Sequence, residues 1–352
     1  MVKHCLKSFL VQITWIYHFN MKRNQQKEQE FQKKIKEGSF SFSYSSLNRL
    51  SFSPQLFYKD YVLNEKEVRM DKHLIEGTLI HLLLLEPEKF DDDFIISPEK
   101  TPSAALQQAL KSIRNMSNKT DLDDLDNEII QALKNVNLYQ SLKDDSKRLT
   151  KVKTPENSLY FEFLCTSDRT IIDQDTYDKC LYRVGIIKDN PEVAKMFKDT
   201  EESDFELDSI KVFNEQYIHA PLKDYTFGIK GFIDRYTIDH DKKQIIITDL
   251  KTTGKTISDF PETIEFYNYW LQAAMYCSLV IKNVPENVQN YKISFNFVVI
   301  DKYNQVYVFP VSDKTLDTWV EAMQGVLKMA DYHCKQNRFD LPYKFLIEKV
   351  IL

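Results

Sequence analysis

The chain has 352 residues, a length that fits one large domain or two small ones. With 43% hydrophobic, 13% aromatic and 28% charged residues it can bury a sizeable core. Only 7 glycines argue against a β-sandwich or a glycine-rich phosphate loop, and a net charge of −5 argues against diffuse attraction of nucleic acid but not against a local basic channel.

The N-terminal stretch does not resemble a membrane or secretion signal. Residues 1–20 contain an apolar run broken by Gln, Tyr and His, which is too short and too polar to span a bilayer and lacks a small-residue cleavage site. Met21 begins a segment that is more typical of the start of a soluble protein. We therefore expect Met21 to be the true start and residues 1–38 to be an extension prone to disorder.

Two helices are predicted next. Residues 40–61 contain an entry helix, for which Ser45 or Ser46 is a suitable N-cap. Residues 70–90 form a largely apolar helix that should end before a proline. His81 lies on this second helix, and a lone histidine in such a position is most often packed in a core, so a ligand role needs further support.

A polar helical region follows. Residues 98–160 and 176–197 are helical in pattern, and the acidic run at 121–126 suits a helix N-terminus. That run lacks the central glycine and terminal ligand of a calcium loop. We expect one domain over residues 39–345, with a helical insertion at about 98–200.

From residue 203 the pattern changes to strands, and the chain's most informative stretch begins at residue 228. Two apolar, β-branched runs flank the polar segment DHDKK, which predicts an antiparallel hairpin. If the turn closes within that segment, Asp234 lies opposite Asp249, with the side chains about 5 Å apart. Lys251 lies two residues beyond Asp249 and shares its face.

Two carboxylates placed this close together are unfavourable unless something offsets their repulsion. At this distance they repel by about 3 kcal/mol at an effective dielectric constant near 20. A divalent cation removes the repulsion because hard cations prefer oxygen ligands, and a lysine beside it can orient or deprotonate a water. The alternative is an exposed hairpin with solvated side chains, but here the Asp-x-Lys pattern ends a buried, isoleucine-rich strand.

These motifs resemble a known family. Asp234 followed by DLK at residues 249–251 resembles the signature of the PD-(D/E)XK nucleases. Gln272 and Tyr276, which share a helical face at i and i+4, resemble the Gln-x-x-x-Tyr element of the branch with the RecB nuclease domain and exodeoxyribonuclease VIII. The segment around His81, EGTLIHLLLLEPEKF, is similar to the histidine helix of phage and prophage proteins of the latter type.

The resemblance implies an α/β (α+β) fold with a mixed central sheet flanked by helices. It implies a Mg²⁺-dependent DNA exonuclease, with Mn²⁺ as a substitute, in phage or prophage recombination or DNA processing. An endonuclease of the same fold remains an alternative. So does a non-catalytic DNA-binding or assembly protein, although such a protein has no use for an intact Asp234, Asp249 and Lys251.

The resemblance also implies roles for single residues. The expected metal ligands are His81, Asp234, Asp249 and the Leu250 carbonyl, with Glu215 on the preceding strand as a further candidate. An unpaired surface glutamate is an equally good interpretation of Glu215. Lys251 is expected to position the attacking water, and Gln272 and Tyr276 to hold the DNA strand or the motif loop. By position, the candidates for DNA contacts are Arg49, Arg235 and Lys255.

Some relatives of RecB hold an iron–sulphur cluster, which we do not expect here. Ser53 occupies the first ligand position, and Cys334 is the one cysteine beyond Cys277. The odd cysteine count without Cys-x-x-Cys spacing indicates reduced thiols, as in a cytoplasmic protein or the host cytosol for a phage protein. The expected partners are double-stranded DNA ends, a single-strand annealing protein and further copies of the chain, and no membrane.

Overall fold

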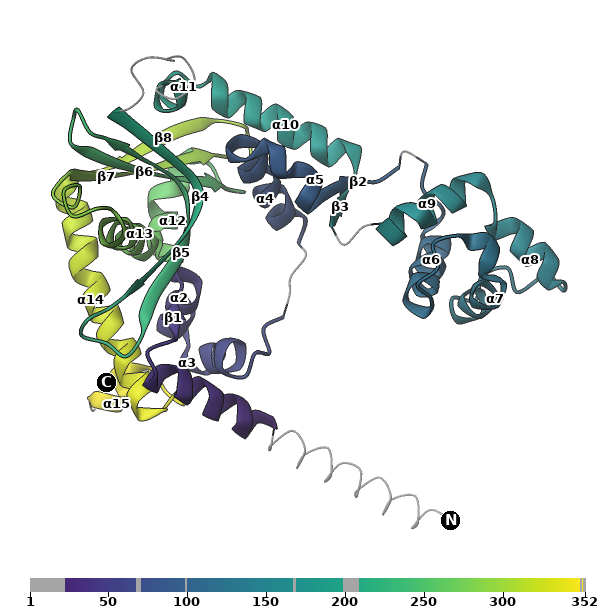
Figure 1. The fold of residues 1–352 in the computed structure, drawn as a ribbon, viewed down its shortest axis with the longest axis horizontal. Helices are drawn as coiled ribbons and strands as arrows, with labels where there is room; N and C mark the ends of the chain where they lie inside the picture. The colour runs from purple at the N-terminus through teal and green to yellow at the C-terminus, as the bar shows by residue number, and fades with distance from the viewer. Residues whose placement is uncertain are drawn as a thin grey trace, which may run out of the picture. The chain divides into compact units, whose positions relative to one another are not determined.

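The computed structural model describes residues 23–67, 71–98, 100–166, 169–198, 209–348 and 350, so the predicted start at Met21 lies outside the described residues. The chain divides into two compact units, Met1–Leu74 with Ile186–Leu352 and Ile75–Gly185 (Figure 1). Each unit has its own elements and is described separately. Within the described ranges, no helix combines the length and apolar character needed to cross a bilayer.

The first unit is built on a mixed sheet. Its strand order is β1-β5-β6-β7-β8, with β4 paired to β5. The β6–β7 and β1–β5 pairs are parallel, and the others are antiparallel. The strands are β1 (Ser41–Phe42), β4 (Ile210–Pro221), β5 (Gly228–Asp239), β6 (Gln244–Thr252), β7 (Lys292–Ile300) and β8 (Val306–Val311). The expectation of a mixed sheet flanked by helices is confirmed.

Helices cover this sheet. Among them α13 packs against β4, β5, β7 and α14, and its buried side chains join those of the strands in one core that includes Ile233, Ile247 and Leu279. Besides a helix over residues 23–36, the unit contains α2 (Tyr44–Phe52), α3 (Pro54–Phe57), a π-helical turn (Tyr58–Val62), α11 (Pro191–Lys198), α12 (Phe260–Tyr267), α13 (Tyr269–Asn283), α14 (Asp313–Gln336) and α15 (Tyr343–Ile347).

The second unit is mainly helical, as predicted for much of this region. Leu110, Ile129 and Phe161 are fully buried in a core of their own, which α6, α7 and α9 share. Its elements are α5 (Phe90–Asp93), α6 (Ala104–Met116), α7 (Asp126–Asn135), α8 (Asp145–Val152), α9 (Pro155–Thr166) and a parallel pair of short strands, β2 (Phe94–Ile96) and β3 (Thr170–Ile172). The chain passes between the units within α4 (Lys72–Leu85) and α10 (Gln174–Asp189).

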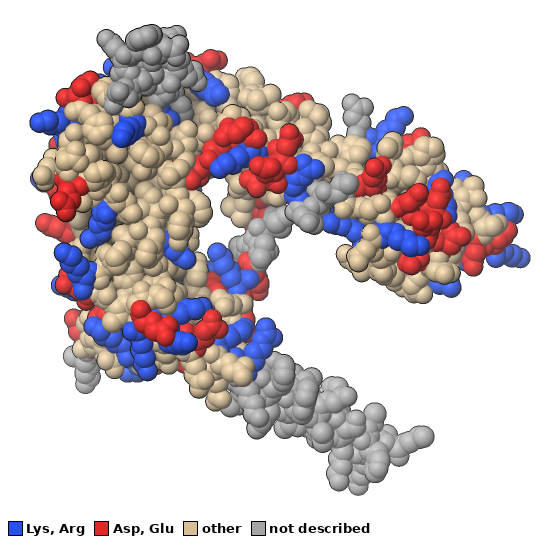
Figure 2. Space-filling view, viewed as in Figure 1, with Lys and Arg blue, Asp and Glu red and all other residues tan. Residues whose placement is uncertain are grey.

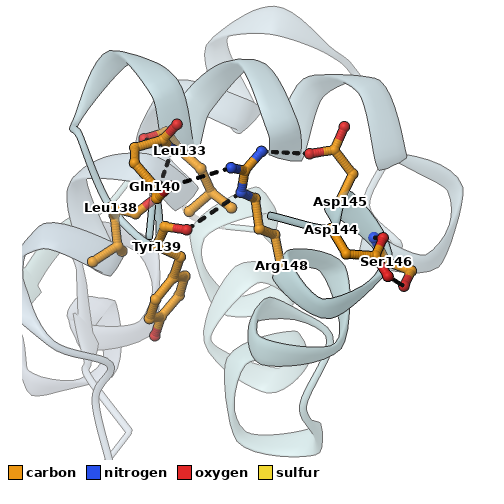
Figure 3. A network of polar contacts seen from close by, with 8 residues as sticks. All are labelled: Leu133, Leu138, Tyr139, Gln140, Asp144, Asp145, Ser146 and Arg148. Atoms are coloured by element: carbon orange, nitrogen blue, oxygen red, sulfur yellow. Dashed lines mark hydrogen bonds and ion pairs between the residues drawn. The ribbon is translucent and has the colours of Figure 1, made fainter. Parts of the chain in front are cut away.

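One arginine ties α8 to the loop after α7 (Figure 3). The Arg148 guanidinium donates to the carbonyls of Tyr139 at 3.3 Å and Gln140 at 3.4 Å, and it pairs with Asp145 at 2.5 Å. Satisfying loop carbonyls with a side chain fixes a segment that has no regular backbone pairing.

Some sequence predictions need correction. Residues 23–36, expected within an extension prone to disorder, form a helix whose Phe31 and Ile35 are buried in the core.

The single helix expected over residues 176–197 is two helices, because Pro191 lacks an N–H and disfavours a helical preceding residue. Asn190 Oδ1 caps the second helix by accepting from the N–H groups of Glu192 and Val193. The break at Pro191 was missed because the helical periodicity of the apolar residues continues on both sides of it.

The N-cap of the entry helix is Ser43, and not Ser45 or Ser46 as predicted. Ser43 has an extended backbone, and its hydroxyl accepts from the N–H of Ser46. The Ser46 hydroxyl in turn accepts from the N–H of Ser43 at 2.9 Å. This reciprocal capping box fixes the start of the helix directly after strand β1.

Candidate functional site

The site lies where two strands of the sheet diverge. On one edge, strand β5 pairs with β4 from Gly228 to Asp239, with a break in the ladder at Asp234. On the other edge it pairs with β1 through Gly228 and Ile229, and with β6 from Arg235 onward. Among the described strands none pairs with residues 230–234 on that edge. The hairpin thus opens at the end of β6 that carries the DLK residues.

The register of β5 and β6 agrees with the predicted opposition of two aspartates, which stand one step beyond the last paired residues. Arg235 pairs with Thr248, so the next step in the same register places Asp234 opposite Asp249. Asp234 Oδ2 accepts the backbone N–H of Leu250 at 2.7 Å. A side chain therefore joins the strands where their ladder ends. Asp249 is fully buried and Asp234 is 9% exposed, so both carboxylates sit in a region of low dielectric constant.

Lys251 neutralises part of this charge. Its Nζ lies 2.5 Å from Asp249 Oδ2 and 4.7 Å from the centre of the Tyr269 ring. Burial lowers the pKa of Lys251, but the charges of Asp249 and then Asp234 outweigh burial, so its pKa is raised above the ordinary value. The lysine is consequently a cation at neutral pH.

Helix α13 orients the second aspartate. Gln272 Nε2 donates to Asp249 Oδ1 at 3.1 Å and to the Tyr276 hydroxyl at 2.9 Å. The carboxylate accepts only, which fixes the amide with its nitrogen toward Asp249. Burial, followed by the charges of Asp249 and Asp234, raises the pKa of Tyr276 well above its usual value. The predicted shared face of Gln272 and Tyr276 is confirmed, and the phenol keeps its proton.

A change of phase in β5 accompanies the site. Ile229 and Ile233 are buried in the core, and beyond Asp234 the buried core positions are Tyr236 and Ile238. Within each half of the strand the buried core residues follow the two-residue period of a β-strand. Between Ile233 and Tyr236 that alternation shifts by one residue. The face that the strand buries therefore switches beside Asp234.

The facing strand shows the same irregularity. Ile218 of β4 is buried and Phe213 packs against the core, although they are five positions apart, an odd spacing that places them on opposite faces of a regular strand. Between them, Glu215 has a φ of 44°, in the left-handed region that a glutamate rarely adopts. The register on both sides places Glu215 opposite Asp234, and a carboxylate oxygen of one lies within 4.8 Å of an oxygen of the other. The sequence indicated this glutamate only through the resemblance, as one of two alternatives.

An open cavity of about 400 Å³ lies beside the Lys251–Asp249 ion pair. Its lining includes Lys251, Gln272 and Tyr276, together with residues 230–232 of β5, whose second edge is not paired with β6. Its remaining lining residues are Ser43, Tyr44, Ser45, Tyr217 and Tyr269. A ligand in this cavity would have direct access to the catalytic lysine expected from the sequence.

Tyr269 is a site residue that the sequence analysis missed. Its ring lies against Lys251, and it lines the cavity. A signal was present, because residues 269, 272 and 276 have the i, i+3, i+7 spacing of one helical face. Extending the Gln-x-x-x-Tyr pattern by one turn toward the N-terminus would have found it.

The three basic residues predicted to contact DNA differ in their burial and in their partners. Arg235 is only 4% exposed, and its guanidinium donates to Asn214 Oδ1 at 2.9 Å and to the Met196 carbonyl at 3.4 Å. The expectation that it meets DNA phosphates is therefore wrong, because its fork is already used inside the protein. Arg49 pairs with the buried Asp60 at 2.8 Å. Lys255 is exposed, with its Nζ 5.4 Å from the centre of the Phe266 ring.

The other predicted residues lie as follows. His81 lies on α4 in the second unit and is half-buried, and its part as a ligand stays a prediction. Ser53 caps α3 by accepting the N–H of Leu56, while Cys277 and Cys334 are buried free thiols.

Comparison with known families decides the identity of this fold. The model of the PD-(D/E)XK nuclease superfamily matches residues 41–339. The chain belongs to this superfamily. The match takes in the β5–β6 hairpin and α13 of this PD-(D/E)XK chain. No curated protein matches it. A crystal structure of a "Putative exonuclease" from Eubacterium rectale aligns with 11% identity over 91% of this chain and 96% of that one, at a TM-score of 0.42, which carries no argument about function.

Proposed function

We propose that the protein is a divalent-metal-dependent deoxyribonuclease that hydrolyses phosphodiester bonds at DNA ends. The observation that carries this proposal is the meeting of Asp234, Asp249 and Lys251 where the strands diverge, beside an open cavity. Membership of a nuclease superfamily supports phosphodiester cleavage. The choice of DNA, of ends and of the metal ion belongs to the proposal.

The donors present fit a hard cation. Asp234, Asp249 and Glu215 offer carboxylate oxygens, which Mg²⁺ and Mn²⁺ prefer, and these three groups outnumber the one lysine among them. Asp234, Asp249 and the Leu250 carbonyl would hold the ion, with Glu215 and His81 as further ligands. When bound, such an ion withdraws charge from the phosphodiester and stabilises the leaving oxygen.

Lys251 acts as a fixed positive charge. Because the charges of Asp249 and Asp234 raise its pKa, its Nζ is a hydrogen-bond donor at neutral pH. Of the two roles open to this lysine, orienting a water and deprotonating it, we propose the first. The lysine would hold the attacking water and balance the charge that develops on the phosphate.

Gln272 and Tyr276 set the geometry. Gln272 holds Asp249 in one orientation through its amide N–H, and its Oε1 accepts no hydrogen bond in the described structure. Tyr276 accepts from the same amide and so keeps its own proton to donate into the cavity. We propose that these two groups hold the DNA strand at the cavity wall. Together with His81 they are also the basis for proposing the exodeoxyribonuclease VIII-like branch and a role in phage recombination.

The test is digestion of linear and circular duplex DNA of the same sequence in Mg²⁺ and in Mn²⁺, with Asp249→Asn as the negative control. Loss of the linear form alone supports an exonuclease. Cutting of both forms makes the protein an endonuclease of the same fold. If neither form is digested in either metal, the proposed nuclease activity is overturned and a DNA-binding or assembly role is favoured.

A further inference from the structure

Two large aromatic side chains lie exposed next to each other on the β4–β5 ladder. Tyr217 and Phe232 are paired in register, and they are 55% and 60% exposed. Their ring centres lie 5.1 Å apart, with the planes tilted by 53°. The neighbouring apolar residues Ile218 and Ile233 are buried, so these rings are left exposed by the same strands that build the core.

The aromatic pair is part of the cavity beside the aspartates. Both rings line it, and so does Lys230, which stands between Ile229 and Gly231 on β5. None of the described lining residues is acidic. Five are aromatic and two are lysines: Tyr44, Tyr217, Phe232, Tyr269, Tyr276, Lys230 and Lys251. In Figure 2 much of the surface over β4 and β5 is uncharged, with isolated basic side chains.

This composition matches one kind of ligand. Proteins that hold single-stranded nucleic acid combine cations along the backbone with aromatic rings on which bases stack. A base inside a duplex has neighbours on both faces, whereas an unpaired base can offer a face to a ring on the protein. A rise of about 3.3 Å per residue puts Phe232 about 7 Å along the strand from Asp234. A base on the aromatic pair would thus belong to a nucleotide close to the cleavage position.

We propose that Tyr217 and Phe232 form a stacking platform for an unpaired nucleobase, with Lys230 meeting the phosphate beside it. The proposal rests on the proposed nuclease function and narrows its substrate, because the strand at the active site is then single-stranded or frayed and not fully paired. Duplex DNA would be attacked after its end opens.

Binding is measured with catalysis blocked by Ca²⁺, using a labelled single-stranded oligonucleotide and a blunt duplex whose ends are crosslinked against fraying. Phe232→Leu keeps the bulk and removes the ring, and Tyr217→Ala removes the other ring. Each should weaken single-strand binding by about tenfold, the usual contribution of one stacked base. Binding of the crosslinked duplex should not change.

Two matched controls isolate the rings. Tyr217→Phe keeps the aromatic face and should bind as the wild type does. Tyr307→Ala removes a tyrosine that is 51% exposed on β8 of the same sheet, and it should also have no effect. A 2-aminopurine base moved along the oligonucleotide should show a stacking change at one position in the wild type and none in Phe232→Leu.

These experiments distinguish failure of the stacking platform from failure of the proposed nuclease function. A wild type that cleaves DNA in Mg²⁺ while Phe232→Leu binds single strands undiminished overturns the platform alone. Equal weakening for the crosslinked duplex overturns it as well, because the rings would then contact DNA of any form. A wild type that neither binds nor cleaves DNA overturns the proposed function.

Discussion

Lys251 and Asp249 form an ion pair that is almost wholly buried, with Nζ 2.5 Å from Oδ2 and side-chain exposures of 14% and 1%. Neither group can be removed without leaving the other's charge inside the protein. Breaking the pair that is proposed to serve cleavage should therefore also destabilise the hairpin.

Replacing one member of the pair should lower stability. Asp249→Asn leaves Lys251 buried without its counter-ion, which costs about 3 kcal/mol or more in comparable sites. Relief of carboxylate repulsion alone would predict the reverse. We expect the single variant to unfold at lower denaturant and to have no nuclease activity. The double variant Asp249→Asn, Lys251→Met should recover most of the stability but no activity. A single variant as stable as the wild type contradicts this account.

The raised pKa of Lys251 predicts a pH dependence. A folded-state pKa raised above the ordinary lysine value of 10.5 means that the charge of this lysine stabilises the fold fully below that value. The contribution is lost as the pH rises through the folded-state pKa. The difference in unfolding free energy between wild type and Lys251→Met should thus be constant from about pH 7 to 9 and should shrink above about pH 10.5. The exposed Lys255→Met is the control, and a difference that shrinks below pH 9 would count against the ion pair.

Local signals in the sequence were sufficient for the hairpin and for the face of α13. The polar turn and the isoleucine run set the register that opposes Asp234 and Asp249, and helical spacing alone joined Gln272 to Tyr276. The burial of Arg235 was not predictable in this way. It depends on contacts with Asn214 and Met196, which are 21 and 39 residues away in the chain.

The backbone of Glu215 was also beyond sequence reasoning, because tertiary pairing imposes its left-handed conformation. This conformation can be tested with three substitutions of Glu215 that all remove its carboxylate but differ in how readily they adopt a positive φ. Glycine and asparagine adopt a positive φ readily, whereas alanine pays about 1 kcal/mol or more there. Glu215→Gly and Glu215→Asn should therefore be more stable than Glu215→Ala in denaturant titrations, and all three should lose nuclease activity if the carboxylate is a ligand. An alanine variant that is the most stable of the three would show that the conformation is not held.

Gly231 allows Tyr276 to approach the sheet. A Cβ at this position would lie 2.9 Å from Tyr276 Cε1 and 3.3 Å from Leu279 Cδ1. Gly231→Ala should displace the tyrosine, lower stability by about 1–3 kcal/mol and reduce cleavage through the disturbed Gln272. Adding Tyr276→Leu should recover stability without recovering cleavage. Gly325→Ala on α14, where a Cβ meets nothing within 4 Å, is the control and should fold and cleave normally.

The salt dependence of DNA binding should identify which basic residues meet phosphates. A handful of contacts predicts a slope of log affinity against log salt of roughly −3 to −5 for duplex DNA, with catalysis blocked by Ca²⁺. Each contact contributes about −0.9 to this slope, or about −0.7 with a single strand. Lys230 lines the cavity and Lys255 is exposed near the motif loop, so Lys230→Ala and Lys255→Ala should each reduce the slope by about that amount.

Arg49 should behave in the opposite way. Its guanidinium is held by Asp60, whose side chain is only 7% exposed. Arg49→Ala should leave the slope unchanged and should lower the free energy of unfolding, because Asp60 loses its partner in a buried position. Measuring slope and stability on one preparation separates a phosphate contact from a structural pair. A slope reduced by about 0.9 at unchanged stability would return Arg49 to the DNA-binding surface.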